Sequence, residues 1–143
     1  MAWVRLSGAR DLRWHPAYRG PDADAVRQLA KSFQALNARH FGGALPALPI
    51  RLSGRLRTRL GQIVLERSTG RPVAIELNRR HVSADDPREV EATVLHEMVH
   101  LWQSVNGHRV DHGPRFRAEA RRVGVTAAAR RMMRARAGGH EPA

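Results

Sequence analysis

The sequence contains no cysteine. A chain without cysteine has no structural disulfide, no thiol nucleophile and no cysteine-based zinc ribbon or finger. Histidine, aspartate and glutamate are therefore the strong metal ligands that remain. Any zinc site in this chain has to be built from imidazole and carboxylate groups.

Long apolar runs are also missing. No segment approaches the roughly 20 consecutive apolar residues that a membrane-spanning helix needs. The N-terminal segment MAWVRLSGARDLRW mixes charged and apolar residues and lacks the continuous apolar stretch of a signal peptide. We therefore expect no membrane partner and a cytoplasmic location.

Acidic residues are scarce, with 13 Asp and Glu against 25 Lys and Arg, which gives a formal net charge of +12. Nearly all of the positive charge comes from arginine, whose guanidinium group can bind a phosphate through two hydrogen bonds. Release of counterions from a nucleic acid would give such a surface salt-sensitive, sequence-independent affinity. DNA, single-stranded or non-specific, is a candidate partner, although a bias of the whole chain towards Arg and Ala also fits coding composition alone.

Aromatic residues make up only 5% of the chain, so Leu, Val and Ala have to fill the core that a 42% hydrophobic content allows. A length of 143 residues suits one compact domain. We expect a single domain over 1–143, with an extended arm at 1–21 and a flexible tail at 138–143.

Hydrophobic spacing predicts helices on both sides of a small sheet. Apolar residues recur at three- and four-residue intervals from an N-cap at Asp22 or Asp24 to the glycines at 42–43, which is one face of a helix. Three shorter runs, with turn residues at 68–70 between the last two, predict a mainly antiparallel sheet with a hairpin. These runs are LPALPIRLSGRL (45–56), LGQIVLE (60–66) and PVAIELN (72–78).

Further helices are predicted after the sheet. One begins near Pro87 and ends near Asn106, because apolar residues again recur at helical intervals between them. A short helix that holds Phe116 follows, and a last helix is expected from about Thr126. The fold class indicated is therefore α+β.

The middle of the second long helix reads His96-Glu97-Met98-Val99-His100. Residues four apart on a helix share one face, so one metal ion can bind both imidazoles. Glu97 is rotated by about 100° from His96, which places its carboxylate beside the open coordination position rather than in a ligand position. The competing interpretation makes these three residues ordinary polar positions on a solvated helix face.

Catalytic zinc usually has three protein ligands and one water molecule, so a third ligand is needed. His112 is the first choice, because it follows a loop that contains Gly107 and precedes Gly113, where the chain can turn back. Its rivals are His108, Asp111 and Glu119, and His108 is the strongest of them because it lies in the same loop.

The run HEMVHLW and the later HGPRF at 112–116 resemble the SprT-like metallopeptidase family, which includes the catalytic domain of the Spartan protease. This protease degrades proteins that are crosslinked to DNA. The family couples a His-Glu-x-x-His helix to a later His-Gly-x-x-Phe, and this chain matches both halves. The similarity extends to FGGALP (41–46), to LG (60–61) and to IELN (75–78), and covers 24 to about 123.

The resemblance implies a zincin-like metallopeptidase core: an N-terminal helix, a small mainly antiparallel sheet, an active-site helix and C-terminal helices. It implies zinc on His96, His100 and His112, general-base catalysis by Glu97 and a buried structural role for Phe116. The implied activity is that of a zinc-dependent metalloendopeptidase acting on proteins or peptides, including DNA-associated or DNA-crosslinked proteins. The Cys-rich segment and long tails of larger relatives have no counterpart here, so we expect no recruitment through them.

Two other functions are compatible with the sequence. A non-catalytic, basic nucleic-acid-binding domain would use zinc only to join its helices, and a fourth protein ligand such as His108 or Asp111 would favour it. A metallopeptidase that acts on one regulatory protein would need no DNA. The number of protein ligands around the metal distinguishes the first of these from an enzyme.

Overall fold

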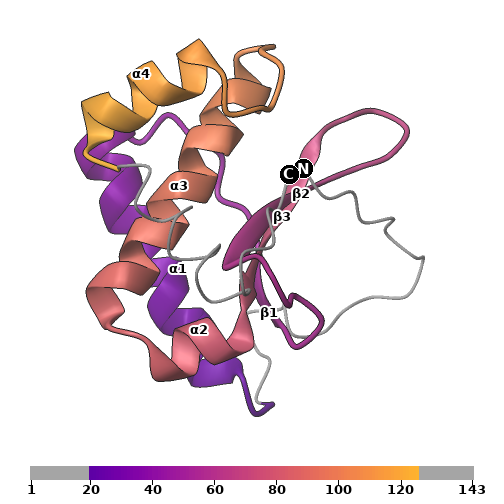
Figure 1. The fold of residues 1–143 in the computed structure, drawn as a ribbon, viewed down its shortest axis with the longest axis vertical. Coiled ribbons are helices and arrows are strands. Elements are labelled where there is room, and N and C mark those ends of the chain that lie inside the picture. Colours follow the sequence, from indigo (N-terminus) through magenta and orange to yellow (C-terminus); the bar gives the residue numbers. More distant parts are fainter. Residues whose placement is uncertain (1–19, 126–143) are drawn as a thin grey trace.

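The computed structural model describes residues 20–125. Most of the predicted arm, the helix expected from about Thr126 and the predicted tail lie outside this range. The described elements are α1 (Ala23–Phe41), β1 (Ile50–Ser53), β2 (Gly61–Leu65), β3 (Pro72–Asn78), α2 (Arg79–Ala84), α3 (Pro87–Val105) and α4 (Pro114–Val123), as Figure 1 shows. The α+β fold class is confirmed.

The sheet has three strands in the order β1-β3-β2. β2 and β3 form the predicted antiparallel hairpin, whose turn includes Gly70 at a φ of 73°. β1 pairs with β3 in parallel, with Ile50 opposite Ile75. The sheet is therefore mixed, with one parallel and one antiparallel pair of strands.

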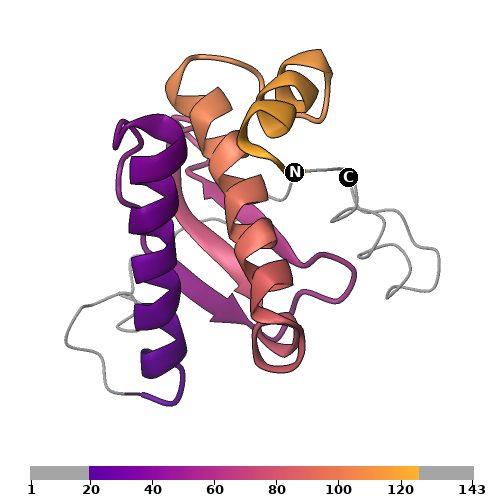
Figure 2. The ribbon, with the colours of Figure 1, turned by 90° about the vertical axis from the view of Figure 1, so that its left-hand side faces the viewer.

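Two long helices, α1 and α3, lie side by side against one face of the sheet, as Figure 2 shows. The hydrophobic core lies between these layers and reaches α4 through Phe116. Met98, Val99 and Leu101 of α3 have no exposed surface. The central turns of α3 are therefore packed inside the protein, and any polar side chain on them has to find its partners there.

The segment after α1 is held in a fixed conformation. Gly42 ends the helix in the left-handed region at a φ of 60°, where glycine is favoured. The side chain of Asn37 then donates to the carbonyl oxygen of Leu45 at 2.9 Å and accepts from its N–H at 3.1 Å. These contacts explain why FGGALP turns sharply from α1 towards the sheet.

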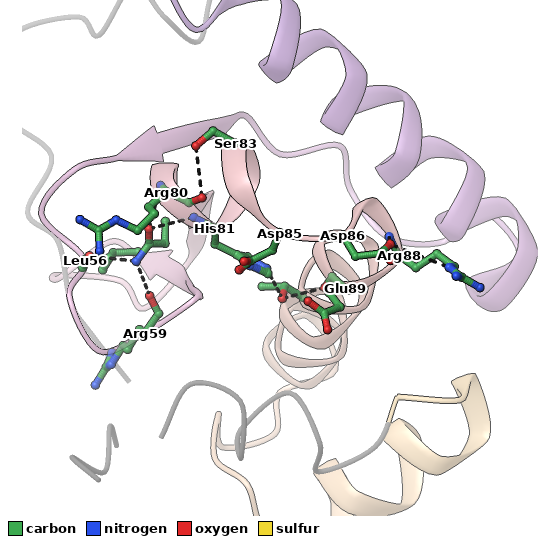
Figure 3. A network of polar contacts seen from close by, with 11 residues as sticks. Leu56, Arg59, Arg80, His81, Ser83, Asp85, Asp86, Arg88 and Glu89 are labelled. Carbon is green, nitrogen blue, oxygen red and sulfur yellow. Dashed lines mark hydrogen bonds and ion pairs between the residues drawn. The ribbon is translucent and has the colours of Figure 1, made fainter. Parts of the chain in front are cut away.

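The short helix α2 was not predicted from the sequence. Its N-cap is Asn78, whose side-chain oxygen accepts from the N–H groups of Arg80 at 2.9 Å and His81 at 3.2 Å. The side-chain nitrogen of Asn78 donates to the carbonyl oxygens of Leu56 at 2.9 Å and Arg59 at 3.1 Å. One amide therefore joins β3, α2 and the loop between β1 and β2 (Figure 3).

His81 joins α2 to α3. Its fully buried ring contacts Asp85 at 2.6 Å through Nδ1 and the hydroxyl of Thr93 at 2.8 Å through Nε2. The hydroxyl of Thr93 also donates to the carbonyl oxygen of Glu89 at 3.1 Å. These polar contacts hold α2 against the first turns of α3.

Within residues 20–125, none of the helices combines the length and the apolar character that crossing a lipid bilayer demands.

Replacing Asn78 with alanine should destabilise the protein by about 2 to 3 kcal/mol, because the N-cap of α2 and both bonds to the loop are lost together. Ser83→Ala is the control, since it removes one exposed hydrogen bond from the same helix. Urea denaturation should show a change below about 0.5 kcal/mol for this control. Equal stability of the two variants would contradict the role assigned to Asn78.

Candidate metal centre

His96 and His100 lie one turn apart on the buried face of α3. They are only 6% and 3% exposed, and their ring centroids are 5.1 Å apart. The helix begins at Pro87, and the side chain of its N-cap, Asp86, accepts a hydrogen bond from the N–H of Arg88. The predicted helix is confirmed, and both histidines point into the protein rather than into solvent.

The loop after α3 brings His112 to the other two histidines. The Nε2 atom of His112 lies 3.3 Å from that of His96 and 3.1 Å from that of His100. One nitrogen atom from each ring falls within 4.8 Å of the others. Among the described residues, this is the one group of histidine and carboxylate side chains arranged to hold a metal ion.

The spacing of these nitrogens fits a zinc ion. Zinc–nitrogen bonds of about 2.0 to 2.1 Å in a tetrahedral arrangement separate the ligand atoms by roughly 3.3 Å. Burial lowers the pKa of His100 to about 3, so this ring is neutral at physiological pH. A neutral imidazole is the form that binds a metal, and the ring needs no proton removed to do so.

Gln103 sets the orientation of His100 and was missed in the sequence analysis. Its side-chain oxygen lies 2.8 Å from Nδ1 of His100. An amide oxygen only accepts, so Nδ1 carries the proton and Nε2 keeps the lone pair that a metal needs. Gln103 is fully buried and follows His100 by three residues on the same helix face. That spacing is the signal that sequence reasoning could have used.

The same glutamine reaches the loop that carries His112. Its side-chain nitrogen donates to Asp111 Oδ1 at 3.4 Å, and this oxygen also accepts from the N–H of Gly113 at 3.0 Å. Arg117 donates to the carbonyl oxygen of His112 at 3.0 Å. Polar contacts therefore hold the loop on both sides of the third histidine.

Phe116 packs against all three imidazoles. Its ring centroid lies 4.8 Å from His96, 4.6 Å from His100 and 4.9 Å from His112. The side chain is 6% exposed and belongs to the predicted short helix, α4. Phe116 thus forms an apolar wall that restricts how far each imidazole can rotate.

Glu97 is buried beside the histidines, with 4% of its surface exposed. Its Oε1 atom has no hydrogen-bond partner within residues 20–125, although a buried carboxyl group normally has one. Burial raises its pKa to about 8. An uncompensated buried oxygen of this kind is suited to contact a group that enters from the cleft.

The histidines and Glu97 open into a cleft of about 170 Å³. One wall is formed by β2 and Arg59 of the loop before it, and the other by α3 and the loop after it. The lining residues are Arg59, Gly61, Gln62, Ile63, His96, Glu97, His100, Val110, Asp111 and His112. An extended ligand can therefore lie between an edge strand and the three imidazoles.

The rivals to His112 have other partners. His108 contacts Arg115 at 3.0 Å and packs against the ring of Trp102. Glu119 forms an ion pair with Arg122 at 2.7 Å. Asp111 lines the cleft, but its Oδ1 accepts from the loop backbone, and it does not belong to the three-histidine group.

The sequence of this chain matches the model of a known protein family. The model of the SprT-like family matches residues 29–136, which is more than half of the chain. The chain belongs to the SprT-like family. The resemblance seen in the HEMVHLW and HGPRF segments is thereby confirmed, and in this SprT-like chain both segments supply histidines to one group. Neither the comparison with curated proteins nor the comparison with solved structures gave a match.

Gln103→Leu should weaken zinc binding by roughly 10- to 100-fold, because Nδ1 of His100 loses its acceptor and the loop loses its tie to α3. Competition with a coloured chelator measures this affinity without any assay of activity. Gln34→Leu, at an exposed position of α1, is the control and should bind zinc like the wild type. Unchanged zinc affinity in a folded Gln103→Leu protein would show that this glutamine does not orient the site.

Proposed function

We propose that this protein is a zinc-dependent metalloendopeptidase, in which His96, His100 and His112 hold the ion and Glu97 is the general base. The convergence of three imidazole nitrogens beside a buried carboxyl group, in an open cleft, is the observation that carries the proposal. Membership of the SprT-like family supports it independently.

The nature of the ligand atoms supports zinc. Three imidazoles with no thiolate or thioether in the group form a nitrogen-only set, which suits zinc in a catalytic site. Bound there, zinc would supply Lewis acidity, which acidifies water and polarises a carbonyl oxygen. Elemental analysis of protein purified without added metal tests the identity of the ion.

Proton transfer is assigned to Glu97. In its deprotonated form, the carboxyl group accepts a proton on an Oε atom from the water that attacks the peptide carbonyl, and then donates it to the nitrogen of the leaving amine. The side chain is buried but lines the cleft beside the three histidines. This position supports the transfer of one proton between two reacting atoms in the cleft.

The number of ligands favours catalysis over a structural role. Structural zinc sites are normally closed by four protein ligands, whereas catalytic sites have three and an open position. Among the described residues, His108 and Asp111 do not join the three histidines. This supports an enzyme rather than a binding domain that uses zinc only to join its helices.

An extended polypeptide is the ligand that the cleft walls favour. β2 has one paired neighbour, β3, among the described strands, and Gly61, Gln62 and Ile63 line the cleft. A substrate strand can add to such an edge through main-chain hydrogen bonds, which depend little on side chains. Peptide bonds within a chain, rather than at its ends, would then reach the metal.

Replacing Glu97 with glutamine should leave zinc bound at about one ion per chain and reduce cleavage by roughly 10²-fold or more, because the proton acceptor is lost. His112→Ala provides the contrast, since it should lower the zinc content itself. Elemental analysis and a quenched fluorescent casein assay measure the two effects. Full turnover by Glu97→Gln would remove this residue from the mechanism, and full zinc occupancy in His112→Ala would move the third ligand elsewhere.

We also propose that DNA is a partner and that DNA-associated or DNA-crosslinked proteins are substrates, on the basis of the net charge of +12. Binding to single-stranded DNA should then weaken by about 10-fold or more as salt rises from roughly 50 to 200 mM. Cleavage of a DNA-binding protein should increase when DNA is added at low salt. Salt-independent binding and unchanged cleavage would favour a peptidase that acts without DNA.

A further inference from the structure

A second cavity lies beside the metal-site cleft, between the loop joining β1 to β2 and the start of α2. Its volume is about 860 Å³, and four of its lining residues are arginines. These are Arg57, Arg59, Arg79 and Arg80. The described residues that line this cavity include no carboxylate and no aromatic side chain. We call it the arginine groove.

The arginine groove and the metal-site cleft share Arg59. This residue ends the loop just before Leu60 and β2, and β2 is the strand that forms one wall of the cleft. Its carbonyl oxygen accepts a hydrogen bond from the side chain of Asn78, which joins the loop to the start of α2, and Figure 3 labels Arg59 and Arg80 in this network. A chain lying along β2 therefore leads from the metal site into the groove.

The carboxylates of the described part of the chain balance only some of the positive charge of the groove. Arg79 forms an ion pair with Asp22 at 2.8 Å. Within residues 20–125, no carboxylate lies within ion-pair distance of Arg57 or Arg80. Charges of one sign that line a recess concentrate the electrostatic potential there and attract an oppositely charged ligand. The fork of a guanidinium group fits a carboxylate through two parallel hydrogen bonds.

We propose that the arginine groove is a substrate subsite that binds acidic side chains of the polypeptide held in the metal-site cleft. The proposal rests on the proposed peptidase function and adds a specificity to it: cleavage next to Asp- and Glu-rich segments. The shared Arg59 supports a peptide, because a ligand that enters both cavities has to present a peptide bond to one and anionic groups to the other.

A nucleic acid fits the groove less well. Proteins that bind single strands combine basic residues with aromatic side chains on which the bases stack, and the described lining offers no aromatic ring. DNA can contact the basic surface elsewhere while an acidic peptide occupies the arginine groove.

Binding tests the groove without relying on cleavage. Two fluorescent peptides of equal length, one with an Asp- and Glu-rich half and one with Asn and Gln in those positions, are titrated into the zinc-loaded Glu97→Gln protein. Fluorescence anisotropy should give roughly tenfold tighter binding of the acidic peptide, which corresponds to one or two charged contacts. Introducing Arg57→Gln and Arg80→Gln together into the Glu97→Gln protein should remove this preference for the acidic peptide.

The control is an equal change of net charge away from the groove. Arg71 and Arg88 are both exposed, and their paired replacement by glutamine also removes two positive charges. It should leave the preference for the acidic peptide intact. If both paired variants lose the preference equally, the effect comes from net charge and the subsite does not exist.

The remaining outcomes separate the two proposals. Acidic-peptide binding that depends on Arg57 and Arg80, without cleavage by the wild-type protein, would support the groove and contradict the peptidase function. Cleavage without any preference for acidic peptides would support the peptidase function and contradict the role of the groove. The proposal would be overturned if binding of a single-stranded oligonucleotide depends on Arg57 and Arg80 while binding of the acidic peptide does not. The groove would then be assigned to nucleic acid.

Discussion

The structure depends on three imidazole rings and one carboxyl group that meet at the cleft, where His96, Glu97 and His100 of α3 are buried and His112 is half-buried. Burying polar groups of this kind costs free energy unless each one gains a partner. His100 gains Gln103, and the Nε2 atom of His112 lies within contact distance of those of His96 and His100. A divalent ion bound between the three rings would accept one lone pair from each of them. This would offset the cost of burying so many polar groups at the cleft.

Gln103 and Phe116 hold the three rings in position. Gln103 connects α3 to the loop of His112 through Asp111, and Phe116 packs against each imidazole. On the opposite wall, Arg59 donates weakly to Gln62 at 3.5 Å, and Gln62 donates to the buried Glu76 at 2.6 Å. The cleft therefore lies between two rigid networks, and the loop that carries Arg59 belongs to one of them.

Local patterns were sufficient to predict much of this arrangement. Helical spacing indicated α1, α3 and α4, the turn residues at 68–70 indicated the hairpin, and the spacing of His96 and His100 indicated a shared metal. His112 was preferred to His108 because of the glycines around it, and the family resemblance supported this choice, because spacing alone does not separate two histidines of one loop. The parallel pairing of β1, the short helix α2, and the roles of Gln103 and Arg59 depend on contacts between distant segments. Hydrophobic periodicity does not encode such contacts.

The central claim concerns where a zinc ion binds and how many protein atoms hold it. The most direct measurement is a crystal structure of the zinc-loaded protein, with anomalous scattering recorded on both sides of the zinc absorption edge. We expect one anomalous peak at about 2.0 to 2.1 Å from the Nε2 atoms of His96, His100 and His112, with the fourth position open to solvent near Glu97. A peak elsewhere, or a fourth protein ligand closing the site, would contradict a catalytic zinc centre.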